Sequence, residues 1–283
     1  MNLRNLLYLI RIDMPVWQDR RKHVCGLTQL RKEMNMKFTH RQPETWQKLQ
    51  NLTAEYLTVA GYKATTPYEL NTARGKVEVD VYVEAPYELV KHIICECKYW
   101  GTPVTKEKIH AFRTVVHDCG AELGIIISKN GYQAGAIEAA AFSNVRLETW
   151  ESFLSIIMDK WIDNRLLAIK VMAARVMSFS DGYTYRAEEL TAEEYPIYQY
   201  TCNSALTTIE QCMLILKSDL LNDGSMLDRF AVQQQYQDIE NYLNVLFKKL
   251  QEVLEVLEKL SVKPDKPDRF ISTMKMYMEN ADN

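Results

Sequence analysis

Residues 75–83 read GKVEVDVYV and residues 92–100 read HIICECKYW, and these two stretches decide the fold. In the first, a valine at every second position alternates with charged or aromatic residues, which is the period of a strand with one buried face. The second begins with an apolar run and then carries Glu96 and Lys98, two positions apart and therefore on one face of a strand. Together they predict neighbouring strands that bring Asp80, Glu96 and Lys98 to one place.

Helical and strand periods continue on both sides of these stretches. Apolar residues at helical spacing precede them and end at Gly61, and the wholly apolar run LGIIIS at 123–128 is typical of a strand buried on both faces. The remaining elements are expected as helices near 105–117 and 132–142 and a strand near 145–148. Their order predicts an α/β domain over residues 43–150, with a mixed central sheet flanked by helices.

Two further regions flank the predicted domain. Residues 1–42 hold nine Lys or Arg against three acidic residues, which predicts a basic N-terminal arm. This arm is either a plain helical extension or a segment that touches DNA or a partner. Residues 151–283 predict an all-α helical hairpin or coiled coil, because leucines recur at steps of three and four over 239–260. We expect oligomerisation or partner docking there, and the alternative is helix packing within one chain.

Composition excludes several classes of protein. The chain has 283 residues, 47% of them hydrophobic and 25% charged, with a net charge of −3. Disordered and fibrous proteins differ from this, and a polybasic coat that binds nucleic acid by bulk charge is excluded. The six cysteines form no CxxC pair, and no apolar run reaches the roughly 18 residues of a membrane helix. A cytoplasmic protein without a membrane segment is therefore expected.

The predicted meeting of Asp80, Glu96 and Lys98 has a chemical consequence. Two carboxylates at one spot repel each other unless a cation lies between them, and hard oxygen ligands select Mg²⁺, with Mn²⁺ as a substitute. A lysine beside that ion can position a water and favour its deprotonated form. Such a group can hydrolyse a phosphodiester, because the metal also neutralises charge at the phosphate. Charged alternation on a half-exposed strand is the plainer interpretation.

Longer motifs strengthen the chemical interpretation. The chain from about Thr45 to Trp150 resembles the Mrr-like restriction endonuclease domain of the PD-(D/E)xK nuclease superfamily, through AEYLTVAGY (54–62), GKVEVDVYV (75–83), ICECKYW (94–100), GAELGIIISKNGYQAGAIEAA (120–140) and VRLETW (145–150). The resemblance implies a restriction-endonuclease-like core and a Mg²⁺-dependent DNA endonuclease. It also implies that Asp80 and Glu96 are metal ligands, with Lys98 as the base or electrostatic stabiliser.

The first helix departs from the family pattern. Such domains often carry an acidic residue near the metal early in that helix, and the position that lines up is Gln50, while Glu55 lies later on the same helix. Either side chain is a candidate for hydrogen bonding the metal-bound water, and Glu55 is equally well explained as a surface charge. The lysines and arginine at 106, 108, 113 and 129 either line a DNA groove or are ordinary surface residues.

The resemblance also implies a biological setting. Domains of this kind are recurrent effectors of bacterial defence against phage and plasmid DNA, including multi-subunit systems of the Lamassu type. Cutting both strands generally needs two active sites, so we expect a homo-oligomer, with a regulatory protein docked on the helical region. The alternatives are a catalytically silent nuclease-fold subunit that binds DNA or supports a larger complex, and a Holliday-junction resolvase.

Overall fold

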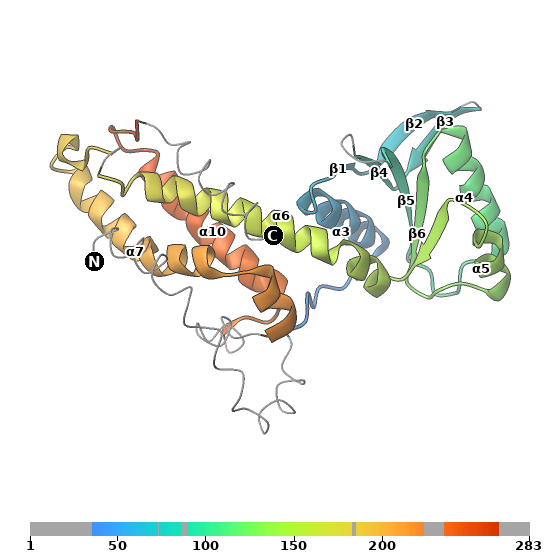
Figure 1. Cartoon of the computed structure of the whole chain (residues 1–283). Coiled ribbons are helices and arrows are strands. Elements are labelled where there is room, and N and C mark those ends of the chain that lie inside the picture. Colours follow the sequence, from blue (N-terminus) through green and yellow to red (C-terminus); the bar gives the residue numbers. More distant parts are fainter. Residues whose placement is uncertain (1–35, 73, 86–89, 183–184, 224–234, 266–283) are drawn as a thin grey trace, which may run out of the picture. The chain divides into compact units, whose positions relative to one another are not determined.

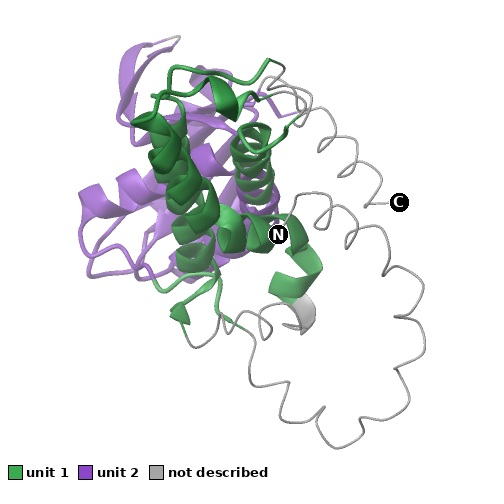
Figure 2. Ribbon diagram, turned by 90° about the vertical axis from the view of Figure 1, so that its left-hand side faces the viewer, with its two compact units in different colours: residues 1–40, 166–283 green, residues 41–165 purple. Residues whose placement is uncertain are grey.

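The computed structural model describes residues 36–72, 74–85, 90–182, 185–223 and 235–265. Two compact units are present: residues 41–165, here the sheet unit, and a helical unit formed by residues 1–40 and 166–283 (Figure 2). The first 35 residues of the predicted basic arm lie outside the described part of the chain. None of the described helices is long and apolar enough to cross a membrane.

The sheet unit confirms the predicted α/β fold. Its central sheet has the strand order β1-β4-β5-β6-β7, antiparallel from β1 to β5 and parallel from β5 to β7. Parallel neighbours need a crossover, and the two helices between them supply it. In chain order the elements are α3 (Trp46–Val59), β1 (Lys63–Thr65), β2 (Tyr68–Thr72), β3 (Gly75–Val79), β4 (Val81–Glu84), β5 (His92–Lys98), α4 (Lys106–Asp118), β6 (Leu123–Ser128), α5 (Ala134–Ala140), β7 (Val145–Glu148) and α6 (Trp150–Ser178).

The stretch that the sequence predicts as one strand is divided at Asp80. Before this residue, β3 pairs with β2 in a separate two-stranded hairpin, with Val79 opposite Tyr68. After it, β4 joins the central sheet, with Val81 opposite Cys95 of β5. Asp80 therefore lies at the bend where the chain passes from one sheet to the other.

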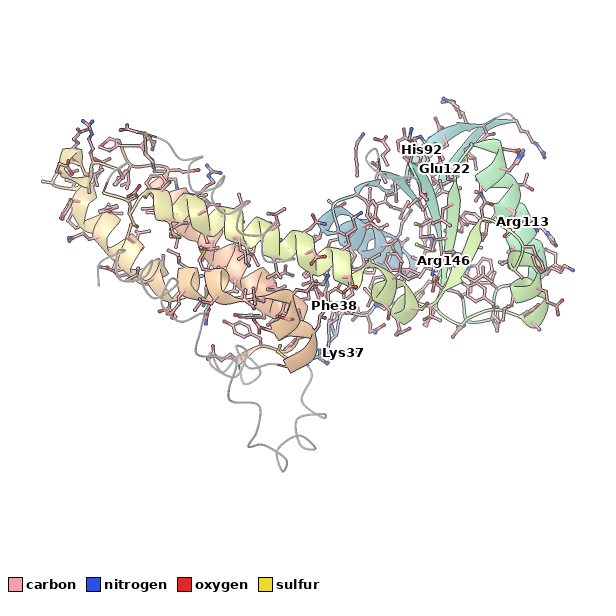
Figure 3. The ribbon with its side chains drawn as sticks, viewed as in Figure 1. Lys37, Phe38, His92, Arg113, Glu122 and Arg146 are labelled. Carbon is pink, nitrogen blue, oxygen red and sulfur yellow. The ribbon has the colours of Figure 1, made fainter. Side chains whose placement is uncertain are left out.

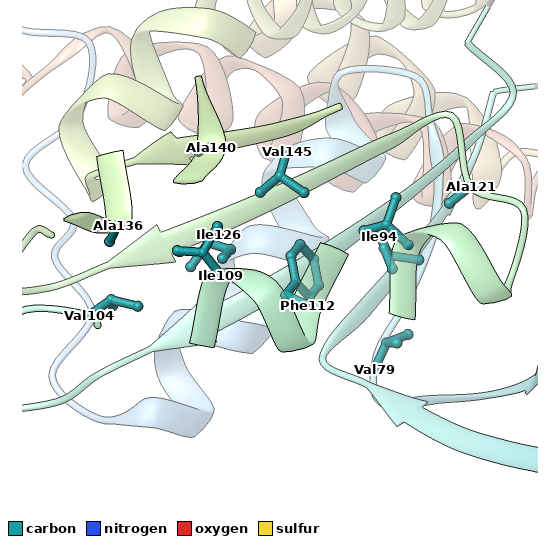
Figure 4. Close-up of a cluster of buried hydrophobic side chains, with 11 residues drawn as sticks. Val79, Ile94, Val104, Ile109, Phe112, Ala121, Ile126, Ala136, Ala140 and Val145 are labelled. Atoms are coloured by element: carbon teal, nitrogen blue, oxygen red, sulfur yellow. The ribbon is translucent and has the colours of Figure 1, made fainter. Parts of the chain in front are cut away.

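Helices cover both faces of the central sheet. The helix α3 lies on one face, and α4 and α5 lie on the other (Figure 1). Between the sheet and the helices α4 and α5, the side chains of Ile94, Ile109 and Ile126 are almost fully buried in one apolar cluster (Figure 4). A Cβ atom at Gly124 would lie only 2.5 Å from a methyl group of Val116 in α4. This close approach explains the glycine in β6.

The helix α6 continues the sheet unit beyond the predicted boundary at residue 150. Its first turns carry Trp150, Phe153 and Trp161, all at most 4% exposed. The ring of Tyr56 in α3 lies 5.6 Å from that of Trp150 and 6.3 Å from that of Trp161, measured between centroids. These aromatic contacts tie the start of α6 to α3, so the compact unit extends to Arg165.

The helical unit packs the second half of α6 beside α7 (Glu194–Leu214) and α10 (Ile239–Leu257) (Figure 1). Short turns of helix lie at Ala187–Glu189 and Asp219–Asp223. The heptad leucines Leu243, Leu246 and Leu250 are completely buried within this unit. These three leucines of the predicted seam therefore pack inside the chain, as the alternative of helix packing within one chain predicts.

The start of α10 is capped by the segment that precedes the sheet unit. The N–H groups of Ile239 and Glu240 donate to the carbonyls of Lys37 and Phe38, at 3.0 and 2.9 Å (Figure 3). Asp238 accepts a further bond of 2.7 Å from the N–H of His40. Free N–H groups at a helix start need such partners. The last part of the predicted arm is thus a helix cap.

Candidate active site

The strand β5 directs its charged and its thiol side chains to opposite faces of the sheet. Cys95 and Cys97 are at most 1% exposed, and the sulfur of Cys97 lies 3.8 Å from the hydroxyl oxygen of Thr53 in α3. Glu96 and Lys98 lie on the other face, with side chains 24% and 18% exposed. Both charged groups are thus held at the edge of the core, where each needs a partner.

Asp80 is fastened to β5 and to α3. Its Oδ2 atom accepts a hydrogen bond of 2.6 Å from the main-chain N–H of Cys97. The side-chain amide of Gln50 donates to the Asp80 carbonyl oxygen at 3.0 Å and to its Oδ1 at 3.4 Å. The side chain of Trp46 also acts on Asp80, because it lowers the pKa of this carboxyl group. Trp46 and Gln50 are four residues apart in α3 and so share one helix face.

The carboxyl group of Asp80 is costly to ionise. Burial, and after it the negative charge of Glu96, raise its pKa, which lies at about 6 instead of the usual 3.8. The N–H of Cys97, the ammonium of Lys98 and the Trp46 donor oppose this rise in pKa. Because the N–H that binds Asp80 belongs to Cys97, between Glu96 and Lys98, the three predicted residues lie in one region of the fold. A cation at this place would relieve the repulsion between the two carboxylates.

Glu96 and Lys98 form an ion pair between the Lys98 ammonium and Oε1 of Glu96. The same ammonium lies 5.0 Å from the ring centroid of Trp100. The other oxygen of this carboxylate, Oε2, accepts no hydrogen bond from the described residues. The negative charge of the same carboxylate raises the pKa of Asp80. One oxygen of Glu96 is therefore held by the lysine while the other is available to a ligand.

The two carboxylates fit a hydrated Mg²⁺ or Mn²⁺ ion. Within the described residues, no three His, Cys, Asp or Glu side chains gather into a complete metal cage. Mg²⁺ does not require one, because it usually keeps several waters and takes one or two carboxylates together with substrate phosphates. Structural zinc needs four nitrogen or sulfur ligands, which Asp80 and Glu96 do not supply.

The two candidates on α3 have different places. Gln50 is 5% exposed and contacts Asp80, as described above. Glu55 is exposed, and its two carboxylate oxygens accept hydrogen bonds of 2.6 and 2.9 Å from the guanidinium of Arg41. Glu55 thus forms a surface ion pair with Arg41, whereas Gln50 is part of the support of Asp80.

Three contributors to this site were not expected from the sequence: Trp46, the main-chain N–H of Cys97 and the ring of Trp100. Trp46 had a usable signal, since it precedes Gln50 by one helical turn. The N–H of Cys97 had none, because every residue but proline carries this group. Trp100 follows Lys98 by two residues, but β5 ends at Lys98, and beyond the end of a strand side chains no longer alternate between its two faces.

The comparison with protein families decides the nature of this domain. Residues 42–157 match the model of the Mrr catalytic family, described as restriction endonuclease. Residues 42–157 are therefore similar to an Mrr-type restriction endonuclease domain. The match supports a nuclease function, and the Mrr-type domain lies inside the sheet unit of residues 41–165.

Two other comparisons add little to the Mrr-type assignment. No curated protein matches the chain. Among solved structures, the chain is similar to one described as "Protein of Unknown Function AF1548", with 17% identity and a TM-score of 0.36. That similarity covers 59% of this chain and 99% of the other.

Proposed function

We propose that this protein is a metal-dependent endonuclease that hydrolyses phosphodiester bonds in DNA, with Asp80, Glu96 and Lys98 as its catalytic residues. One observation carries the proposal. The N–H of Cys97 binds the carboxylate of Asp80, which joins the bend between the two sheets to the strand that bears Glu96 and Lys98. The match to the Mrr-type model supports the nuclease class. This hydrogen bond supports a shared role for the three side chains, because Cys97 stands between Glu96 and Lys98 in the strand.

Each side chain has a role in this proposal. Asp80 and Glu96 would hold Mg²⁺ or Mn²⁺, which when bound supplies Lewis acidity and lowers the pKa of a bound water. Lys98 positions the attacking water and stabilises its deprotonated form with the ammonium that now pairs with Glu96. Gln50 holds Asp80 in place from α3, and Trp46 on the same helix face lowers the pKa of the Asp80 carboxyl group.

The proposal extends to control and biological role. An uncontrolled nuclease would damage its own genome, so we place this protein in bacterial defence, as an effector in the cytoplasm that assembly switches on. Cutting both strands needs two sites, which favours a homo-oligomer with a regulatory protein on the helical unit. Because the α10 leucines are buried, docking would use exposed apolar side chains such as Ile197 and Tyr200 of α7, 50% and 77% exposed.

Cleavage of supercoiled plasmid tests the proposal. Purified protein is incubated with Mg²⁺ or Mn²⁺, with EDTA in parallel, and nicked and linear products are measured. We expect metal-dependent cutting that Lys98→Ala abolishes. The matched control is Lys160→Ala. The ammonium of Lys160 lies 4.1 Å from the ring centroid of Tyr62, which follows the C-terminal end of α3, whereas Trp46 begins that helix.

The outcome also separates the proposal from its alternatives. Cutting by both wild type and Lys98→Ala would contradict the assigned site. A folded protein that stays inactive, even with the products of neighbouring genes added, would favour a catalytically silent subunit. Preferential cutting of four-way junctions over plasmid would favour a resolvase.

A further inference from the structure

A half-exposed aromatic ring lies directly beside the proposed catalytic lysine. Trp100, two residues after Lys98, is 37% exposed. Two ammonium groups approach this one indole: that of Lys98 at 5.0 Å and that of Lys108 at 5.8 Å from the ring centroid. Lys108 comes from the first turn of α4, so the indole links the catalytic strand to that helix.

The main chain at Trp100 is also held in place. Its carbonyl oxygen accepts a hydrogen bond from the side-chain amide of Asn130. The N–H of Lys129 donates to the carbonyl of Lys98 at 3.0 Å, and the Lys129 ammonium lies 4.1 Å from the ring centroid of Tyr99. The ammonium groups of Lys98 and Lys108 thus share the ring of Trp100, and that of Lys129 lies over the neighbouring ring of Tyr99.

Only one of these three charges is compensated within the described residues. Lys98 pairs with Glu96, while no described carboxylate forms an ion pair with Lys108 or Lys129. Lys108 therefore presents, on the ring that it shares with Lys98, a positive charge that attracts an anion. The anion that a nuclease brings to this place is the DNA backbone, whose phosphates attract lysine and arginine in all sequences.

We propose that Trp100 and Lys108 position the DNA substrate of the Mrr-type domain, and this inference rests on the proposed endonuclease function. Lys108 binds a backbone phosphate next to the one that is hydrolysed. Trp100 acts through both lysines, because its ring restrains the ammonium of Lys98 on the catalytic side and that of Lys108 on the substrate side. Trp100 is a positioning residue, and Lys108 is a substrate-binding residue.

Binding to a labelled DNA duplex in EDTA tests the phosphate contact without cleavage. The dissociation constant is measured by fluorescence anisotropy over a range of salt concentrations. For Lys108→Ala we expect several-fold weaker binding and a salt dependence reduced by about one phosphate contact, for all DNA sequences alike. Trp100→Ala should weaken binding similarly, and Trp100→Phe should restore it because an aromatic face remains. Lys160→Ala, again a lysine over an aromatic ring, should bind as the wild type does.

Cleavage kinetics with Mg²⁺ separate the two roles. Lys108→Ala should raise KM with little change in kcat, whereas Trp100→Ala should raise KM and also lower kcat, because Lys98 loses its aromatic support. If the wild type cuts DNA and Lys108→Ala keeps both the full salt dependence of binding and the wild-type KM, the positioning role is overturned and the endonuclease function stands. A wild type that neither binds nor cuts DNA overturns the endonuclease function and this role with it.

Discussion

The main-chain N–H of Cys97 donates a hydrogen bond of 2.6 Å to the carboxylate of Asp80. This bond connects the bend between β3 and β4 to the C-terminal end of β5, beyond the residues of β5 that pair with β4. Its donor belongs to the main chain, so side-chain substitution at Cys97 leaves it in place. The position of Asp80 beside Glu96 and Lys98 is therefore built into the backbone.

The raised pKa of Asp80 predicts that this carboxylate destabilises the metal-free fold. Folded Asp80 keeps its proton up to about pH 6, and the unfolded chain keeps it only up to about 3.8. Stability from this group is thus complete below pH 3.8 and is lost as the pH rises to 6. Asp80→Asn carries no charge and can still accept from Cys97, so in EDTA it should melt at a higher temperature than wild type near neutral pH.

Melting curves of Asp80→Asn and wild type check this at two pH values. The difference should vanish at about pH 4, where the wild-type carboxyl is also neutral in the fold. Added Mg²⁺ should raise the melting temperature of the wild type and leave that of the variant unchanged, because a ligand that binds only the fold stabilises it. Equal melting temperatures near neutral pH would contradict the burial of an ionised Asp80.

Gln50 offers a test of the first-helix position. In Gln50→Glu the amide that donates to the Asp80 carbonyl is lost, and a third carboxylate is placed beside Asp80 and Glu96. Repulsion should make the metal-free variant melt below wild type at neutral pH, and Mg²⁺ should recover more stability in the variant than in wild type. Gln50→Met is the control, because it removes the same donor without adding charge. A variant that behaves like Gln50→Met under both conditions would place position 50 away from the metal.

Glu55 should be dispensable for cleavage. Its partner Arg41 is 42% exposed and its own side chain is 50% exposed, so their ion pair is well screened by water. We expect Glu55→Ala to cost less than about 1 kcal/mol of unfolding free energy and to leave the cleavage rate close to wild type. Denaturant unfolding and plasmid cleavage measure the two effects. A large loss of cleavage in a stably folded Glu55→Ala protein would assign this glutamate to the site after all.

The leucines of α10 should control stability within a single chain. Leu250 has no exposed surface, and its removal leaves a cavity among buried neighbours. Leu250→Ala should cost about 2–5 kcal/mol of unfolding free energy, and the loss should not depend on protein concentration. Exposed Val256 on the same helix, 36% exposed, is the matched position for a control alanine. A midpoint that shifts with protein concentration for Leu250→Ala would instead place this leucine at a subunit interface.

The sequence predicts the sheet better than its connections. Alternation and apolar runs identify β5 and β6, because burial of one or both strand faces directly selects residue types. The break at Asp80 has no such signal, since the alternation of valines continues unchanged through it. The extension of the sheet unit along α6 was missed for a related reason. Apolar residues occur on all sides of α6, whose first part belongs to the sheet unit and whose second part belongs to the helical unit, so no change of pattern marks residue 165.

The site could be predicted in part. Asp80, Glu96 and Lys98 follow from strand spacing, and the structure brings these three together. The choice between Gln50 and Glu55 could not be made from residue chemistry, which favours the glutamate as a ligand. Helix geometry gives the other answer, because Gln50 lies one turn after Trp46 on the buried side while Glu55 reaches Arg41 at the surface. The helix face thus decides which residue contacts Asp80.

Divalent metal binding is the most direct test of the site formed by Asp80 and Glu96. Binding of Mn²⁺ is measured by electron paramagnetic resonance on wild type, Asp80→Asn and Glu96→Gln, each with and without a short DNA duplex, and Glu55→Gln serves as the control. We predict one Mn²⁺ per chain in wild type and in Glu55→Gln, and a loss of that ion in each of the other two variants. Retention of the ion in both Asp80→Asn and Glu96→Gln would contradict the proposed metal site.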